Sequence, residues 1–174
     1  GFDLEEAAMI IAVNTIAGIA GTVFSGWFSD KVFKGDRKYP AFVAGILEAI
    51  ALVLFLYGGN SWFINVLAMC LFGIAIGVLI CFIGGLMAVD LVPRKATGAA
   101  LGIVGLASYI AAGLMNVISG WLIDGHAIKD AVTGEVIQYD FTYVSIFWVG
   151  AAVVSFLLPI LNWKRKKMEL SASE

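Results

Sequence analysis

Long stretches without charged side chains alternate with short charged segments along the whole chain. Residues 7–29, 49–89, 96–123 and 141–163 contain no Asp, Glu, Lys or Arg, and these stretches are 23, 41, 28 and 23 residues long. A helix that crosses the hydrocarbon core of a bilayer needs about 20 apolar residues. Each stretch therefore predicts at least one membrane-spanning helix, and the longest can contain one helix and the end of another.

Turn-forming residues divide the longest stretch. The sequence Tyr57-Gly58-Gly59-Asn60-Ser61 gathers glycine, asparagine and serine, as turns commonly do. We therefore predict an all-α fold, a polytopic membrane helix bundle with five spans. The spans cover about residues 5–29, 40–57, 62–89, 97–123 and 141–163.

One sizeable loop, residues 124–140, joins the fourth and fifth spans. Its apolar residues, among them Ile128, Val136 and Ile137, flank Thr133-Gly134. Apolar positions on both sides of a glycine-containing turn are typical of a short β-hairpin. We predict one here.

Composition agrees with a bilayer location. Hydrophobic residues make up 61% of the chain and charged residues 14%, against about 45–50% and about 25% in soluble proteins. A domain of 18.5 kDa has too little interior to bury that much apolar surface. The composition excludes a soluble enzyme and a disordered chain. The net charge of −2 and the short basic clusters give no support to nucleic-acid binding.

The basic residues predict the orientation in the membrane. Ten of the 11 Lys and Arg residues follow spans one, three and five, and only Lys129 falls on the opposite side. Basic loops stay on the cytoplasmic side, which places the C-terminus inside and the N-terminus outside. A chain that starts outside without Met or a signal peptide resembles a piece of a longer protein. We expect a C-terminal transmembrane domain over residues 1–163 and a basic cytoplasmic tail over 164–174.

Small residues form helical stripes on spans one, three and four. In lipid, such residues let helix backbones approach one another. For the glycines we favour a packing role, and we expect spans one, three and four to line a cavity with the bulkier spans two and five outside. The stripes are Asn14, Gly18, Gly21 and Ser25; Cys70, Gly73, Gly77, Cys81 and Gly84; and Gly98, Gly102, Gly105, Tyr109, Gly113, Asn116 and Gly120.

Three polar residues on these stripes are candidates for a substrate cavity. Tyr109 and Asn116 interrupt the glycine stripe of span four, and Asn14 lies on span one. Lipid penalises hydrogen-bonding groups, so these side chains should face protein or water. For Tyr109 and Asn116, lining a polar cavity and making a dry hydrogen bond between helices both stay open.

Glu48 is the only ionisable residue well inside a predicted span. Such a residue is a functional candidate by default, and proton coupling is the specific form of that hypothesis. The alternative is a protonated or hydrogen-bonded carboxyl on a supporting helix. The two cysteines, Cys70 and Cys81, lie in an apolar run without ligand spacing, so we predict neither a metal site nor a cofactor.

The segment after span one carries a recognisable signature. A helix ends in Gly26-x-x-x-Asp30, and a tight basic turn follows. This resembles the loop signature of the major facilitator superfamily, found after the second span of each six-helix half. The resemblance implies that the five spans are helices 8–12 of twelve and that the partner is the remaining part of the protein, helices 1–7.

The same resemblance implies a latch on the cytoplasmic side that holds one transport state. A carboxylate at the end of a helix can pair with nearby cations or with the N-terminus of a neighbouring helix. The alternative is a solvated turn whose exposed ion pairs contribute about 0–1 kcal/mol each. The latch residues would be Gly26, Asp30, Lys31, Gly35, Arg37 and Lys38, with Asp90 and Arg94 on the same side of the membrane.

Residues 90–109 resemble helices ten and eleven of the organophosphate:phosphate antiporters, a family that includes glycerol-3-phosphate and hexose-6-phosphate transporters and a related sugar-phosphate sensor. The resemblance implies a bacterial inner-membrane carrier that exchanges a phosphorylated small molecule for inorganic phosphate by alternating access. Tyr109 matches the tyrosine of helix eleven in that family, whereas Gly77 stands where helix ten has a tyrosine. The phosphate-binding arginines of the family belong to helices outside this chain.

Three alternatives stay open. The chain can belong to a sensor of the same fold, or to a carrier of another small organic anion. A membrane enzyme or a structural subunit of a larger complex is a different class. Such enzymes usually gather His, Cys or carboxylates within the spans, whereas the single histidine here, His126, falls in a loop. We therefore predict that the protein is not an enzyme.

Overall fold

The computed structural model describes residues 2–32, 38–90 and 92–161. Two predicted latch residues, Gly35 and Arg37, and the predicted basic tail 164–174 lie outside this part of the chain.

Helices occupy each predicted span. Four of them are long and apolar enough to cross a membrane, and a shorter apolar helical stretch covers Thr142–Leu157. The prediction of an all-α membrane helix bundle is confirmed. The elements are α1 (Leu4–Val32), α2 (Lys38–Tyr57), α3 (Trp62–Cys81), the π-helix η1 (Phe82–Leu86), α4 (Met87–Asp90), the 3-10 helix η2 (Arg94–Ala96), α5 (Thr97–Gly125), β1 (Ala127–Lys129), β2 (Val136–Tyr139) and α6 (Thr142–Leu161).

Local sequence explains where the first helices begin and end. At the start of α1, the Glu6 amide donates to Asp3 Oδ1 at 2.8 Å, and the Asp3 amide donates to Glu6 Oε2 at 3.3 Å. This reciprocal pair satisfies amides that have no partner inside the helix. Between α2 and α3, Gly59 adopts φ +81°, and Asn65 Nδ2 donates to the carbonyl of Gly59 at 3.0 Å. Glycine tolerates that backbone conformation, so the predicted turn forms.

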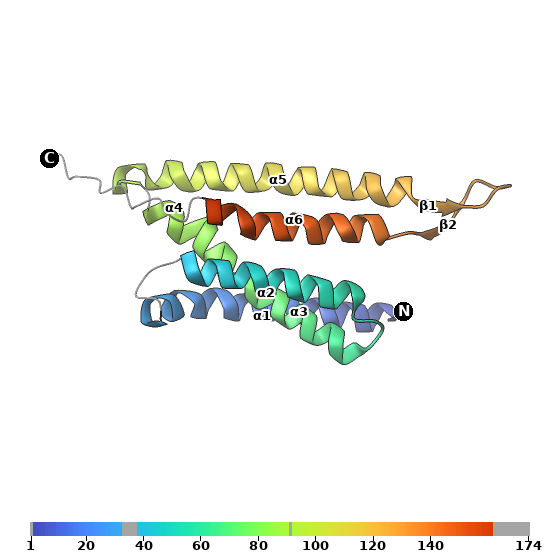
Figure 1. Ribbon diagram of the computed structural model, residues 1–174, viewed down its shortest axis with the longest axis horizontal. Helices are drawn as coiled ribbons and strands as arrows, with labels where there is room; N and C mark the ends of the chain where they lie inside the picture. The colour runs from blue at the N-terminus through green and yellow to red at the C-terminus, as the bar shows by residue number, and fades with distance from the viewer. Residues whose placement is uncertain (1, 33–37, 91, 162–174) are drawn as a thin grey trace.

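The predicted hairpin is confirmed. Strands β1 and β2 pair antiparallel, with Ala127 opposite Tyr139 and Ile128 opposite Gln138. Gly134 takes φ +73° in the turn, and its amide donates to the carbonyl of Asp130 at 3.0 Å. The hairpin projects beyond the helices at the end of the molecule where the N-terminus lies (Figure 1). We call this the hairpin end, and the opposite end, which carries the C-terminus of α1, the start of α2 and η2, the η2 end.

The helices form two groups (Figure 1). Helix α3 packs against both α1 and α2, α2 packs against α6, and α5 packs beside α6 and α4. We expected span two to lie outside, but α2 lies between α3 and α6, because its alanines and a glycine allow close contact on two sides. Its buried residues are Pro40, Ala44, Gly45, Ala49 and Ala51.

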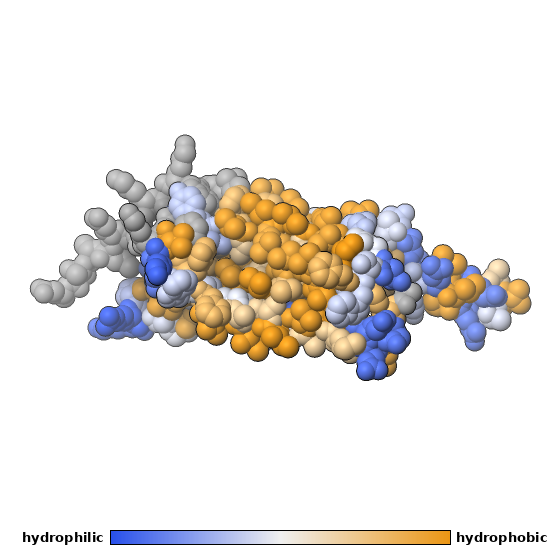
Figure 2. Space-filling model, turned by 90° about the horizontal axis from the view of Figure 1, so that it is seen from below, coloured by the Kyte–Doolittle hydropathy of each residue, from blue (hydrophilic) through white to orange (hydrophobic). Residues whose placement is uncertain are grey.

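The surface has the layout of a membrane protein. Hydrophobic side chains fill the middle of the visible face, and hydrophilic ones gather toward both ends (Figure 2). An apolar belt between two polar ends matches the hydrocarbon core between two headgroup layers.

The small-residue stripes of α1 and α3 pack against each other. A Cβ added at Gly21 would lie 2.5 Å from the carbonyl oxygen of Ile74, and one at Gly77 would collide with the carbonyl of Gly18. Thr22 Oγ1 donates to the carbonyls of Gly18 at 2.9 Å and Gly77 at 3.2 Å. The packing interpretation is therefore confirmed for Gly18, Gly21, Gly73 and Gly77, whereas an added Cβ at Gly84 would meet nothing within 4 Å.

Span four differs from that expectation. Within the described part of the chain, no residue of α5 is buried, and a Cβ added at any stripe glycine of α5 meets nothing within 4 Å. The two pockets described at α1 and α3 are lined by residues of α1, α2, α3 and η1, and neither includes a residue of α5. Stripe glycines of α1 and α3 are taken up by the contact between these two helices, so a cavity that they share with α5 stays a prediction.

Candidate functional site

The exposed face of α5 carries two of the three cavity candidates. Tyr109 is 82% exposed, and Asn116 is exposed seven residues further along, which is about 10 Å of helix rise. Neither side chain makes a hydrogen bond to any residue that the structure describes. Tyr109 and Asn116 therefore make no hydrogen bond to another helix within this part of the chain. The exposed face of α5 presents a phenol and an amide between glycines at which an added Cβ would meet nothing within 4 Å. Both groups can donate hydrogen bonds to an anionic ligand.

Asn14 lies at a different interface. Its backbone carbonyl and its Oδ1 face Gly73 of α3, closely enough to collide with an added Cβ there. The Oδ1 atom is buried, and it has no hydrogen-bond partner among the described residues. A buried acceptor without a partner costs about 1–3 kcal/mol. The structure therefore does not bring Asn14 together with Tyr109 and Asn116.

Gly77 is part of the α1–α3 contact rather than of an open pocket. It is buried, and an added Cβ would also lie 2.9 Å from the amide nitrogen of Thr22. A tyrosine at this position would force α1 and α3 apart. The glycine here is thus required by close packing of the two helices.

Glu48 lies half-buried on α2. One turn earlier, Gly45 faces α6, where an added Cβ would lie 2.5 Å from Cβ of Phe156. The Phe42 ring packs edge-on against Phe156 with centroids 5.9 Å apart. The carboxyl group is therefore on a helix that packs between α3 and α6, away from the exposed face of α5. Proton coupling and a supporting role both stay hypotheses.

The predicted latch residues that are described come from elements that begin or end at the η2 end of the molecule (Figure 1). Asp30 and Lys31 are exposed near the end of α1, and Arg94 is exposed in η2. Lys31 Nζ lies 4.9 Å from the centroid of the Trp27 ring, a cation–π distance. Lys38 begins α2, and Asp90 ends α4. The grouping at one end agrees with a latch, but we see no ion pair between Asp30 and another described residue.

The hairpin end holds contacts that the sequence analysis missed. Asp140 Oδ1 accepts a hydrogen bond from the Thr142 amide at 2.9 Å, at the start of α6. The Thr142 side chain, its amide and the nearby His126 hold the pKa of Asp140 below its ordinary value of 3.8. The His126 ring stacks on Tyr143 with centroids 3.9 Å apart, and its Nδ1 lies 2.8 Å from the Leu122 carbonyl oxygen. The Asp-x-Thr spacing before α6 could have revealed the cap.

Asp130 organises the hairpin turn itself. Its Oδ1 accepts from the amides of Val132 at 2.7 Å and Thr133 at 2.9 Å. These bonds, with that of Thr133 the largest influence, lower the pKa of Asp130. Asp130 and Asp140 therefore have structural roles in turns and caps. The described residues hold no group of three or more His, Cys, Asp or Glu side chains that could bind a metal ion.

Comparison with known proteins identifies the family of the chain. The model of the Major Facilitator Superfamily matches residues 1–172. The glycerol-3-phosphate transporter of Bacillus subtilis is 36% identical over 174 residues, which is 96% of this chain and 35% of that protein. The membrane sensor protein UhpC of Escherichia coli is 34% identical over 70% of this chain and 27% of its own length. The phosphoglycerate transporter protein of Salmonella typhimurium is 30% identical over 71% of this chain and 26% of its own.

The chain thus spans about a third or less of the length of these curated relatives. They are named transporters and a sensor, which agrees with the prediction that the protein is not an enzyme. The sequence resemblance to organophosphate carriers is also confirmed by these names. No solved structure matches the chain.

Proposed function

The chain belongs to the Major Facilitator Superfamily, and from this membership we propose that it forms part of a secondary active transporter that exchanges a phosphorylated small molecule for inorganic phosphate. It is a multi-pass membrane protein with a bundle of apolar helices. The proposed location is a bacterial inner membrane with the C-terminus in the cytoplasm. The proposed partner is a set of further helices of the same protein, equivalent to helices 1–7.

The single observation that carries this proposal is the shared chemistry in the relatives' names. Glycerol-3-phosphate, phosphoglycerate and hexose phosphate are all small organic phosphate esters. A carrier for such substrates needs hydrogen-bond donors for phosphate oxygens and cations for their charge. Residues 1–29, 49–89, 96–123 and 141–163 contain no Lys or Arg. The cations of the site would therefore come from the proposed partner helices.

We assign the exposed face of α5 to the transport pathway. Its phenol at Tyr109 and amide at Asn116 can donate to phosphate or sugar oxygens without unmaking a bond to any described residue. The open glycines around them leave room for a ligand or for a partner helix. Alternating access would then expose this face to each side of the membrane in turn, because the site of such carriers lies between two lobes.

The proposal is tested with the full-length transporter in proteoliposomes. We expect labelled glycerol-3-phosphate or hexose-6-phosphate to enter vesicles loaded with inorganic phosphate, and to enter much more slowly when internal phosphate is omitted. Uptake that is independent of internal phosphate contradicts exchange. Failure of every phosphate ester, with uptake of a different organic anion, contradicts the substrate class.

A sensor is the second candidate, and the similarity to a protein named a membrane sensor favours it. A sensor would bind a hexose phosphate with little flux. A sensor would bind hexose phosphate in isothermal titration calorimetry. Its uptake rate per protein in proteoliposomes would be less than a tenth of that expected for a carrier.

A further inference from the structure

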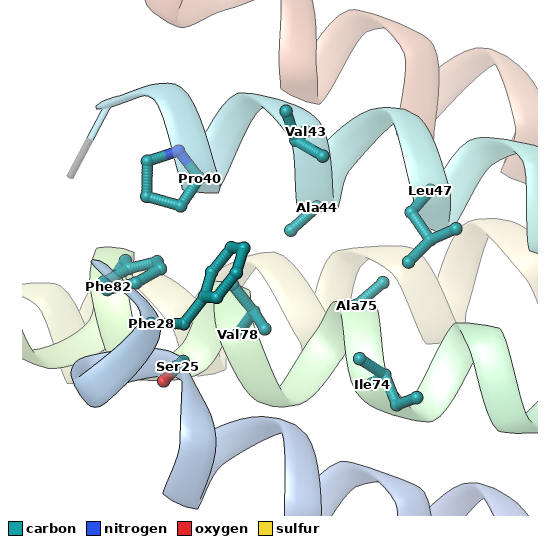
Figure 3. Close-up of a pocket in the computed structure, with 10 residues that line it drawn as sticks. All are labelled: Ser25, Phe28, Pro40, Val43, Ala44, Leu47, Ile74, Ala75, Val78 and Phe82. Atoms are coloured by element: carbon teal, nitrogen blue, oxygen red, sulfur yellow. The ribbon is translucent and has the colours of Figure 1, made fainter. Parts of the chain in front are cut away.

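An apolar crevice opens between α1, α2 and α3 near the η2 end (Figure 3). Its volume is about 120 Å³, roughly four times the 30 Å³ that one water molecule occupies in the liquid. Ala44 of α2, Ala75 of α3 and Phe82 of η1 are buried and form its inner wall. Phe28 and Val43, which are 47% and 57% exposed, form its rim. The Phe28 ring reaches from α1 toward α2 and α3 (Figure 3).

The crevice offers an occupant no polar contact. Ser25 is the only lining residue with a polar side chain, and its hydroxyl donates to the carbonyl of Thr22 at 2.8 Å. A phosphate group or a water cluster would therefore lose hydrogen bonds by entering. The volume is also too small for a helix, whose diameter with side chains is about 10 Å. A short stretch of a hydrocarbon chain, a few methylenes long, fits both the size and the chemistry.

Cations and amphipathic aromatic residues lie within three residues of crevice-lining residues on α1 and α2. On α1, Trp27 directly precedes Phe28, and Lys31, about one turn further on, forms the cation–π pair with Trp27. Lys38 and the exposed Tyr39 precede Pro40, which lines the crevice on α2. Trp and Tyr are typical of the membrane–water boundary, and Lys near that boundary attracts anionic lipid headgroups. The crevice thus begins at the depth where a headgroup meets its acyl chains.

We propose that this crevice binds the headgroup-proximal part of one acyl chain of an anionic phospholipid, with the headgroup held beside Lys31 and Lys38. Lipid is the solvent at this depth, and an empty apolar void would forfeit dispersion contacts along its walls. The two lysines select a negative headgroup through charge, while the acyl chain supplies the area of contact. This site is separate from the exposed face of α5, and it does not depend on which substrate the protein carries.

The test uses the full-length protein in detergent with added phosphatidylglycerol or phosphatidylcholine of identical acyl chains, followed by native mass spectrometry. We expect about tenfold higher retention of phosphatidylglycerol. Filling the crevice by Ala44→Phe should abolish retention of both lipids. The double variant Lys31→Gln/Lys38→Gln should reduce phosphatidylglycerol to the level of phosphatidylcholine.

Matched variants keep the test independent of folding. Val53→Phe adds the same ring to an exposed position of α2 outside the crevice, and Lys129→Gln removes a cation at the hairpin end; both should retain lipid like the wild type. If Ala44→Phe does not fold, Val43→Trp at the rim tests the same space. Equal retention of the two lipids by the wild type, a bound second copy in place of lipid, or unchanged retention in the filled variants would each overturn the proposal.

Discussion

Single side chains in this protein divide into those that support the fold and those left open for a ligand. The polar groups at the hairpin end are engaged, since Asp130, Asp140 and His126 all bond to backbone groups of turns and helix ends. Tyr109 and Asn116 differ, because they are exposed in a span where an isolated polar group would be costly in lipid. This contrast is why we assign the substrate pathway to α5.

Tyr109 provides the direct test of that assignment. Tyr109→Phe removes the hydroxyl that, in our proposal, donates to a charged phosphate ester, and a hydrogen bond of that kind contributes about 1.5–3 kcal/mol. We expect the affinity for the substrate to fall by about 10-fold to 100-fold, with normal expression of the variant. The measurement is the concentration dependence of exchange in proteoliposomes. Tyr139→Phe on the hairpin serves as the control, and exchange that is unchanged in Tyr109→Phe would remove this residue from the site.

Asp140 makes a pH-dependent contribution to stability. Its pKa is lowered in the folded protein by the Thr142 side chain, the Thr142 amide and His126. A lowered pKa means that the stabilisation is present above the unfolded value of about 3.8 and is lost as the pH falls through the folded value. We expect Asp140→Asn to lower the unfolding temperature slightly at pH 6, and to make no difference at the acidic limit. A difference between the two proteins that persists or grows below pH 3 would contradict this role.

At the scale of helices, the α1–α3 contact holds the first group together. Backbones approach so closely that a Cβ at Gly21 would lie 2.5 Å from the Ile74 carbonyl oxygen and 2.9 Å from its Cα. Backbone atoms cannot move aside as a flexible side chain can. In lipid, where no hydrophobic force joins helices, such close packing supplies much of the association energy.

We therefore expect Gly21→Ala to destabilise the protein by about 1–3 kcal/mol, the usual range for overpacking. Thermal unfolding in detergent, followed by the loss of monodisperse protein, measures the change. Gly150→Ala on α6 is the matched control, because an added Cβ there meets nothing within 4 Å and alanine favours helix over glycine. Equal stability of the two variants would mean that α1 and α3 pack less closely than described.

The elements themselves were largely predictable, but their partners were not. Span lengths follow from hydrocarbon thickness, and the Thr133-Gly134 turn follows from glycine's access to positive φ. A stripe of small residues, however, shows which face of a helix allows close contact, but it does not predict which helix packs against that face. The stripes of α1 and α3 pack against each other, whereas an added Cβ at the stripe glycines of α5 contacts nothing in the described part of the chain. The stacking of His126 on Tyr143 joins the end of α5 to the start of α6, and hydrophobic periodicity does not predict such a contact.

At the scale of the whole molecule, the two ends have different character. The hairpin end is fixed by hydrogen bonds within turns and caps. The η2 end gathers exposed charges from α1, α4 and η2, together with the half-buried Lys38 at the start of α2. In a carrier that alternates between two states, an end that changes partners needs contacts weak enough to break in each cycle. Exposed ion pairs, at about 0–1 kcal/mol each, meet that need better than buried ones.

We expect the charge of Asp30 to shift the balance between the inward-facing and outward-facing states through a contact at the η2 end. It is exposed at the end of α1, and it makes no ion pair with the described residues, so a partner met in one transport state would stabilise that state alone. Removing one exposed pair of up to about 1 kcal/mol by Asp30→Asn should shift the ratio of inward-facing to outward-facing forms by up to about fivefold. The ratio is measured on the full-length protein by the rate of crosslinking between cysteines placed at the η2 ends of its two lobes. Glu135→Gln, an exposed carboxylate on the hairpin, is the control for charge alone. If both variants crosslink like the wild type, the Asp30 carboxylate belongs to a solvated turn, and other residues set the ratio of the two transport states. If both variants shift this ratio equally, the effect comes from net charge and not from a contact at the η2 end.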